Sequence, residues 1–158
     1  MTTQPMIVQW PGASGRWYAH TVFPWDVLPD VENANFILVA ARGMTALPLF
    51  IGVSEALPRE LPLRPEWSAA QMHGLTHVHV HLLAADARER ETIRSDIAAC
   101  VETPFNGQAR PAGARAGLIQ VTPGEPVRWL GGRQISHRAA QLGMKFILPR
   151  VAAVKRAG

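Results

Sequence analysis

The chain of 158 residues has a single cysteine, no long apolar run and almost no acidic residues in its last third. A lone cysteine, Cys100, excludes an internal disulfide and favours a reducing compartment, so we expect a cytoplasmic protein. No stretch of about 18 consecutive apolar residues is present, which argues against a transmembrane helix. Residues 1–5 supply neither a basic start nor an apolar core, so no secretory signal is expected.

The charge that is present is unevenly spread along the chain. Residues 1–106 hold 7 Lys and Arg against 11 Asp and Glu, a net charge of −4, whereas residues 107–158 hold 9 against 1, a net charge of +8. With 47% hydrophobic residues, the chain can build one core and carry an extension. We therefore predict a domain over 1–106 and a basic linker and C-terminal extension over 107–158. Such an extension could bind nucleic acid, an acidic partner protein or the acidic domain itself, or it could be a solvated tail.

Hydrophobic periodicity predicts a mixture of short strands and helices. Six runs predict strands, the first two as a β-hairpin: 6–10, 16–23, 35–41, 47–53, 76–82 and 117–121. Four segments predict helices: one capped by Ser54 and ending at 61, one over 65–73, one of about four turns starting at Asp86, and one over 137–148. In the third helix, Ile93, Ile97 and Val101 form a single apolar stripe.

Four short strings follow one another in a distinctive order. They are Ala34-Asn35-Phe36, Phe50-Ile51-Gly52, Leu57-Pro58-Arg59-Glu60-Leu61, and a segment from Ile93 that closes with Pro104-Phe105-Asn106. Their order and spacing resemble the GIY-YIG nuclease family over residues 34–106, and the hairpin at 6–23 suits bacterial members. The resemblance implies an α+β fold, with a small central mixed or antiparallel sheet flanked by helices.

The groups that carry chemistry in that family are mostly replaced here. In the family, tyrosine hydroxyls take a proton, an arginine stabilises the phosphate and a glutamate holds a divalent metal. The equivalent positions in this chain are Phe36, Phe50, Gly52, Glu60, Arg94 and Asn106. Only Gly52 and Asn106 match, and both have structural uses. The resemblance thus implies a degenerate, catalytically inactive member of the family, a pseudoenzyme.

Two readings of the replaced positions stay open. Glu60 stands at the arginine position and Arg94 at the glutamate position, so the exchanged pair could form a salt bridge across the old site. Alternatively, Arg59 and Glu91 could substitute for the lost groups in an active Mg²⁺-dependent DNA endonuclease. In the first reading the protein needs no cofactor, and only in the second would it use Mg²⁺.

Several basic residues are candidates for binding nucleic acid. They are Arg59, Arg64, Arg128 and Arg133, of which Arg64 lies where the family often has a histidine. Trp129 beside Arg128 could stack on a base, although packing on the domain explains it as well. A further alternative is a protein-interaction module in which the groove and the basic extension hold a partner protein. No membrane partner is expected.

Three alternating histidines look like metal ligands at first sight. His77, His79 and His81 share one face of a predicted strand, with neighbouring Cα atoms roughly 6.5–7 Å apart, which is too far for all three to bind one tetrahedral ion easily. Two of them with a ligand from another strand could bind a metal, and a pH-sensitive or phosphate-contacting face is a further alternative. We favour surface or helix-covered histidines and therefore expect no metal site. Cys100 has no basic neighbour and is expected to be inert.

Overall fold

A computed structural model describes residues 5–106 and 117–130 of the chain. The described strands are β1 (Ile7–Pro11), β2 (Trp17–Pro24), β3 (Glu32–Arg42), β4 (Thr45–Ala56), β5 (His77–His81), β6 (Ile119–Gln120) and β7 (Arg128–Trp129). The described helices are α1 (Leu57–Glu60), the 3-10 turn η1 (Leu61–Leu63), α2 (Pro65–Met72) and α3 (Ala87–Ala98). None of these helices is long and apolar enough to cross a membrane.

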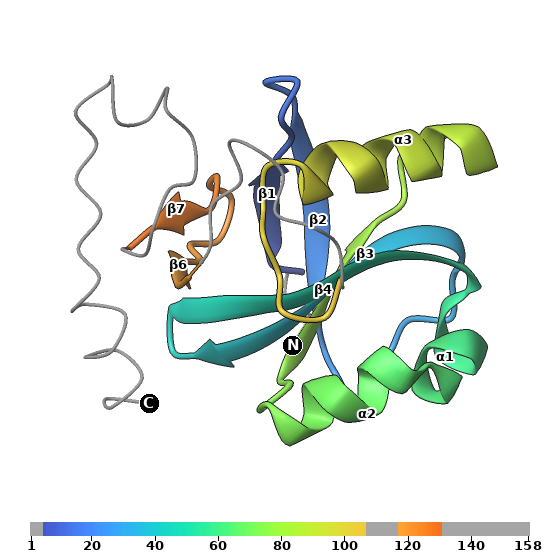
Figure 1. Cartoon of the computed structure of the whole chain (residues 1–158), viewed down its shortest axis with the longest axis horizontal. Coiled ribbons are helices and arrows are strands. Elements are labelled where there is room, and N and C mark those ends of the chain that lie inside the picture. Colours follow the sequence, from blue (N-terminus) through green and yellow to red (C-terminus); the bar gives the residue numbers. More distant parts are fainter. Residues whose placement is uncertain (1–4, 107–116, 131–158) are drawn as a thin grey trace.

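The strands form one curled antiparallel sheet in the order β1-β2-β5-β3-β4-β6-β7. The curl brings the segment between β6 and β7 back to β1, where the Gln9 carbonyl accepts from Val127 N at 2.9 Å and Gln9 N donates to the Glu125 carbonyl at 3.2 Å. Figure 1 shows α3 on one side of the sheet and α1 with α2 on the other. These features confirm the predicted α+β class with an antiparallel sheet flanked by helices.

Each face of the sheet has its own hydrophobic core. On the α3 face, the predicted stripe of Ile93, Ile97 and Val101 is buried against a cluster that includes Trp10 and Ile37. Ile93 and Ile97 lie in α3 and confirm its apolar stripe, whereas Val101 is buried beyond the end of the helix at Ala98, so the helix is shorter than expected.

The opposite face packs against α1, η1 and α2. Leu57, Leu61, Trp67 and Ala70 of these segments are buried against strand residues that include Phe36. The central strand β3, which supplies side chains to both cores, is buried along most of its length, as its continuous apolar run predicts.

The predicted helix cap at Ser54 is wrong. Ser54 is a buried residue of β4 that pairs with Ala34 of β3, and α1 begins only at Leu57, after Ala56. Ser, Thr, Asn and Asp favour N-caps when only the local chain is considered. Here strand pairing with β3 outweighs that local preference and extends β4 through Ala56.

The β1–β2 turn is fixed to α3 by one carboxylate. Asp96 Oδ2 accepts hydrogen bonds from Ser14 Oγ at 2.6 Å and from Tyr18 Oη at 2.7 Å, and Oδ1 accepts from Ser14 N at 2.8 Å. A Cβ on Gly12 would lie 2.0 Å from Asp96 Oδ2, so only glycine leaves room for this contact. Burial opposes ionisation of Asp96, but the hydrogen bonds from Ser14 and Tyr18 outweigh it and hold the pKa of Asp96 below its usual value.

Part of the predicted C-terminal extension continues the sheet. Strand β6 pairs with β4 through Ile119 and Ala46, and β7 pairs with β6. Ile119, Val121 and Val127 are buried in the α3-side core. The described part of 107–158 therefore packs on the same body as 1–106, and β6 confirms the strand expected over 117–121. The helix expected over 137–148 lies outside the described residues.

We predict that Asp96→Ala destabilises the protein by about 1–3 kcal/mol at pH 7, because it leaves a partly buried hydroxyl and a turn amide without their acceptor. Because the pKa of Asp96 is lowered in the folded state, its contribution is present above the unfolded pKa of about 3.9 and is lost as pH falls through the lower, folded pKa. The difference in unfolding free energy between wild type and variant, measured by urea unfolding from pH 7 to pH 3, should therefore shrink toward the acid end. Asp26→Ala, at an exposed loop position, is the control. Equal unfolding midpoints for the wild type and Asp96→Ala at pH 7 would contradict the stabilising role of the Asp96 hydrogen bonds.

Candidate functional site

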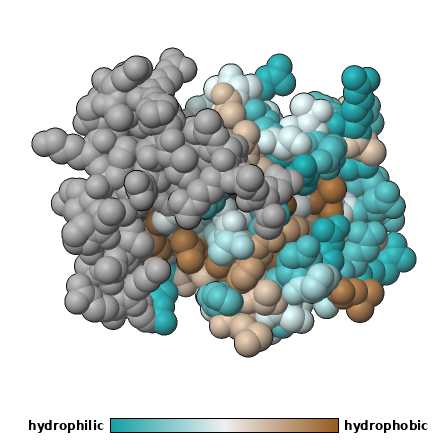
Figure 2. Space-filling model, viewed as in Figure 1, coloured by the Kyte–Doolittle hydropathy of each residue, from teal (hydrophilic) through white to brown (hydrophobic). Residues whose placement is uncertain are grey.

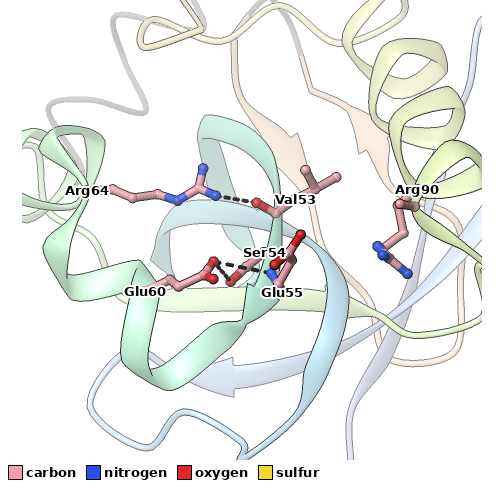
Figure 3. Close-up of a pocket in the computed structure, with 7 residues that line it drawn as sticks. Val53, Ser54, Glu55, Glu60, Arg64 and Arg90 are labelled. Carbon is pink, nitrogen blue, oxygen red and sulfur yellow. Dashed lines mark hydrogen bonds between the residues drawn. The ribbon is translucent and has the colours of Figure 1, made fainter.

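A groove of about 310 Å³ opens at the end of β4, between α1 and α3 (Figure 3). Its lining residues are Val53, Ser54 and Glu55 from β4, Glu60 from α1, Arg64 from the junction of η1 and α2, and Ala87 and Arg90 from the first turn of α3. Figure 3 shows Arg64 and Arg90 on opposite sides, with the end of β4 between them. Two of the sequence-predicted site residues, Glu60 and Arg64, line this groove.

The two phenylalanines at the tyrosine positions are core residues. Phe36 is fully buried and Phe50 is 7% exposed, and their ring centroids are 5.8 Å apart. A Cβ on Gly52 would lie 2.7 Å from an atom of each ring, so glycine is required for the two rings to close over β4. The Phe-Ile-Gly string therefore acts in packing, and neither ring carries a hydroxyl that could transfer a proton.

Glu60 is held by donors from β4. Its Oε2 accepts from Ser54 Oγ at 2.8 Å and from Glu55 N at 3.2 Å. The Ser54 hydrogen bond is the main cause that lowers the pKa of Glu60, and nearby Arg64 adds to it. The carboxylate is therefore ionised at neutral pH, and one of its oxygens is already committed to two hydrogen bonds.

The predicted Glu60–Arg94 salt bridge is wrong. Arg94 Nη2 instead lies 2.5 Å from Glu91 Oε1, one turn back on the same helix, and also donates to Ser95 Oγ. A pair spaced i,i+3 on one helix is already adjacent, so it forms without bridging the groove. The Arg94 hydrogen bond lowers the pKa of Glu91, which is 54% exposed.

The charged residue of α3 that lines the groove is Arg90, not Arg94. In the structure, α3 ends at Ala98 and a turn follows before Asn106. The proposed substitutes do not line the groove either, since Glu91 pairs with Arg94 and Arg59 is exposed on α1.

Arg64 is anchored over the aromatic pair. Its Nη2 donates to the Val53 carbonyl, and its guanidinium carbon lies 5.4 Å from the centroid of the Phe36 ring. A guanidinium at this distance over a ring face is attracted by the ring quadrupole. Arg64 is thus held in one orientation at the groove wall.

Asn106 acts as a strand partner for β4. Its Oδ1 accepts from Ile51 N at 2.9 Å and from Thr103 Oγ1, and its Nδ2 donates to the Ile51 carbonyl at 2.8 Å. The neighbouring Phe105 N donates to the Leu49 carbonyl at 3.1 Å. As expected from the sequence, Asn106 ties the segment after α3 to the sheet.

The remaining sequence-predicted residues lie away from the groove lining or outside the described residues. Arg128 is exposed on β7, and its neighbour Trp129 packs against the α3-side core. Arg133 is not among the described residues. Within residues 5–106 and 117–130, no three His, Cys, Asp or Glu side chains are grouped as metal ligands.

Sequence reasoning missed two residues, Arg90 and Asn35. Asn35 is 2% exposed, and its Nδ2 donates to the Arg90 carbonyl at 2.8 Å, which links β3 to the first turns of α3. One signal was available, because Asn35 is a polar residue at the start of the otherwise apolar run 35–41. Arg90 had no distinguishing signal among the other charged residues of α3.

We predict that Asn106→Ala destabilises the protein by roughly 1–3 kcal/mol, because it leaves both polar backbone groups of Ile51 without a partner. Thermal unfolding monitored by circular dichroism measures the effect. Gln71→Ala, which removes an exposed amide from α2, serves as the control and should change stability little. A melting temperature for Asn106→Ala equal to that of the control would show that Asn106 does not tie this segment down.

On the face in Figure 2, hydrophilic side chains predominate over the α3 and α1 side of the described body, where the groove lies. Comparison of the chain with protein-family models, curated proteins and solved structures found no match. The groove and its arginines are therefore the basis for a functional assignment.

Proposed function

We propose that the chain is a degenerate, non-hydrolytic GIY-YIG nuclease-like domain whose groove binds the phosphate backbone of a nucleic acid. The observation that carries the proposal is the placement of Arg64 and Arg90 on opposite walls of one groove. Arginine presents a planar fork of donors that fits phosphate oxygens, and it stays charged at any physiological pH. Two guanidinium groups that face one opening can bind two successive phosphates or share a single phosphate.

The acidic residues of the groove do not neutralise the two arginines to the same extent. Glu60 is compensated by the hydroxyl of Ser54 and the amide of Glu55. By contrast, none of the side-chain hydrogen bonds or ion pairs found among the described residues involves the guanidinium of Arg90, which leaves it available for a ligand. Residues 1–106 have a net charge of −4, so the attraction for phosphate must come from the groove itself. The basic C-terminal extension adds a general positive potential.

The absence of hydroxyls on Phe36 and Phe50 supports binding without cleavage. Phosphodiester hydrolysis needs a proton acceptor near the attacking water and stabilisation of the developing charge. With buried phenyl rings at both tyrosine positions, the groove offers arginines for binding but no phenol for the proton. The single cysteine fits a reducing cytoplasm, to which we assign the protein as part of this proposal.

One observation favours an active Mg²⁺-dependent endonuclease as the second candidate. Glu55 and Glu60 both line the groove, and carboxylate oxygens are the ligands that Mg²⁺ prefers. A protein-interaction module is the remaining alternative, and it differs from nucleic-acid binding in the expected dependence on salt.

We predict that Arg90→Ala weakens binding to a labelled nucleic acid about five- to tenfold, since it removes one phosphate contact. Fluorescence anisotropy with single-stranded, duplex and branched DNA and with RNA measures the dissociation constant across a salt series. Losing one contact should also reduce the slope of log K against log salt by roughly one. Arg88→Ala is the matched control, because Arg88 is an exposed arginine of α3 that does not line the groove. Equal losses in both variants, or no binding by the wild type, would refute the groove assignment.

We predict no cleavage of any of these substrates with Mg²⁺ or Mn²⁺ by the folded protein. Gel analysis with an EDTA lane and repurified protein provides the check. Metal-dependent cutting that disappears in Glu55→Gln would replace our proposal by the endonuclease alternative.

A further inference from the structure

A row of buried polar side chains crosses the sheet beneath α3. His20 on β2 is 1% exposed, His81 on β5 is 4% exposed and Asn35 on β3 is 2% exposed. Asn35 and His81 are cross-strand partners, and the rings of His20 and His81 lie with centroids 5.3 Å apart. Three neighbouring strands thus bring two imidazoles and one amide together in the interior.

Hydrogen bonds fix which nitrogen of each imidazole carries a proton. The Nδ1 of His20 lies 2.8 Å from the Tyr18 carbonyl, and the Nδ1 of His81 lies 2.7 Å from the Ala19 carbonyl. Because a carbonyl oxygen only accepts, both Nδ1 atoms must be the donors, and in each neutral ring the lone pair is on Nε2. Burial lowers the pKa of His20 to about 3, so this ring is neutral at physiological pH.

Two acceptors in this row have no hydrogen-bond partner among the described residues. They are His20 Nε2 and Asn35 Oδ1, both fully buried. The bond from Asn35 Nδ2 to the Arg90 carbonyl fixes the orientation of the amide, so the oxygen is the unpaired atom. A buried acceptor without a donor costs about 1–3 kcal/mol. The residues that carry these two atoms both neighbour His81, and a bound cation or hydrogen-bond donor would satisfy the atoms.

We propose that His20 Nε2, His81 Nε2 and Asn35 Oδ1 form a buried binding site for a divalent transition-metal ion of the Zn²⁺ class. Imidazoles whose Nδ1–H donates to a backbone carbonyl are oriented as metal ligands commonly are. Two imidazoles that share a tetrahedral ion at about 2.1 Å have ring centroids roughly 5 Å apart, close to the spacing of His20 and His81. The third donor is an amide oxygen, and water completes the four-coordinate set.

His79 is excluded from this set although it neighbours it. Its Nδ1 accepts from Trp10 Nε1 at 3.0 Å, so the lone pair of Nδ1 is used and the proton of the neutral ring sits on Nε2. His77 is only half-buried and bonds to Thr76 Oγ1. The ligand set therefore joins three strands, rather than the alternating histidines of β5.

The test is metal binding by the untagged full chain. After metal-free purification, isothermal titration with Zn²⁺ should show one tight site, and Co²⁺ should give the visible absorption of a tetrahedral complex. His20→Phe and His81→Phe should each weaken the tight site at least tenfold, whereas His79→Phe should retain it. A double variant, His73→Gln with His77→Gln, removes more exposed histidines and should also retain the site.

The Asn35→Asp variant tests whether Asn35 is a metal ligand or only a structural residue. It keeps the shape of the side chain and supplies an anionic oxygen, so Zn²⁺ should bind more tightly even though the metal-free protein loses the bond to the Arg90 carbonyl. Circular dichroism confirms folding of each variant. A wild type without a 1:1 site, a site that survives His20→Phe, or Asn35→Asp binding Zn²⁺ no more tightly would each overturn the proposal. None of these readouts depends on nucleic-acid binding.

Discussion

The outer edge of β4 is the constraint on which the site depends. Beyond its short pairing with β6, this strand has backbone groups that point away from β3, and an unpaired edge invites association with other chains. Groups from outside the sheet bond to alternate residues along it: Phe105 N to Leu49, Asn106 to Ile51, Arg64 to Val53 and Glu60 to Glu55. Positions that the nuclease resemblance associates with chemistry thus serve to close an edge of the sheet.

Edge closure also determines the geometry of the groove. Arg64 is fixed by the Val53 carbonyl and the Phe36 ring, and Glu60 by Ser54 and the Glu55 amide. On the facing wall, the first turns of α3 are tied down where Asn35 bonds to the Arg90 carbonyl. Both walls are therefore held by bonds to strands, and little ordering would be needed when a phosphate binds between the arginines.

Local patterns predicted the elements well and the contacts between them poorly. The run that became β3 and the stripe on α3 were readable because burial imposes a period on the sequence. Ser54 was wrongly predicted to be a helix cap because the preference of serine for caps depends on the local sequence. Its pairing with Ala34 depends instead on a distant strand. The closure of the sheet through Gln9 and Pro126 joins segments distant in sequence, and no local signal marks it. Arg90 was missed because nothing in the sequence distinguishes it from the other charged residues of α3.

Asn35 connects the interior of the protein to the groove. The amide nitrogen bonds to the Arg90 carbonyl, while the buried amide oxygen has no hydrogen-bond partner among the described residues, and Asn35 pairs with His81 across the sheet. An ion bound to the amide oxygen would polarise the amide and strengthen the bond that its nitrogen donates to α3. The position of Arg90 would then respond to metal. Since coupling between two binding sites is reciprocal, any factor by which Zn²⁺ tightened phosphate binding would equal the factor by which phosphate tightened Zn²⁺ binding.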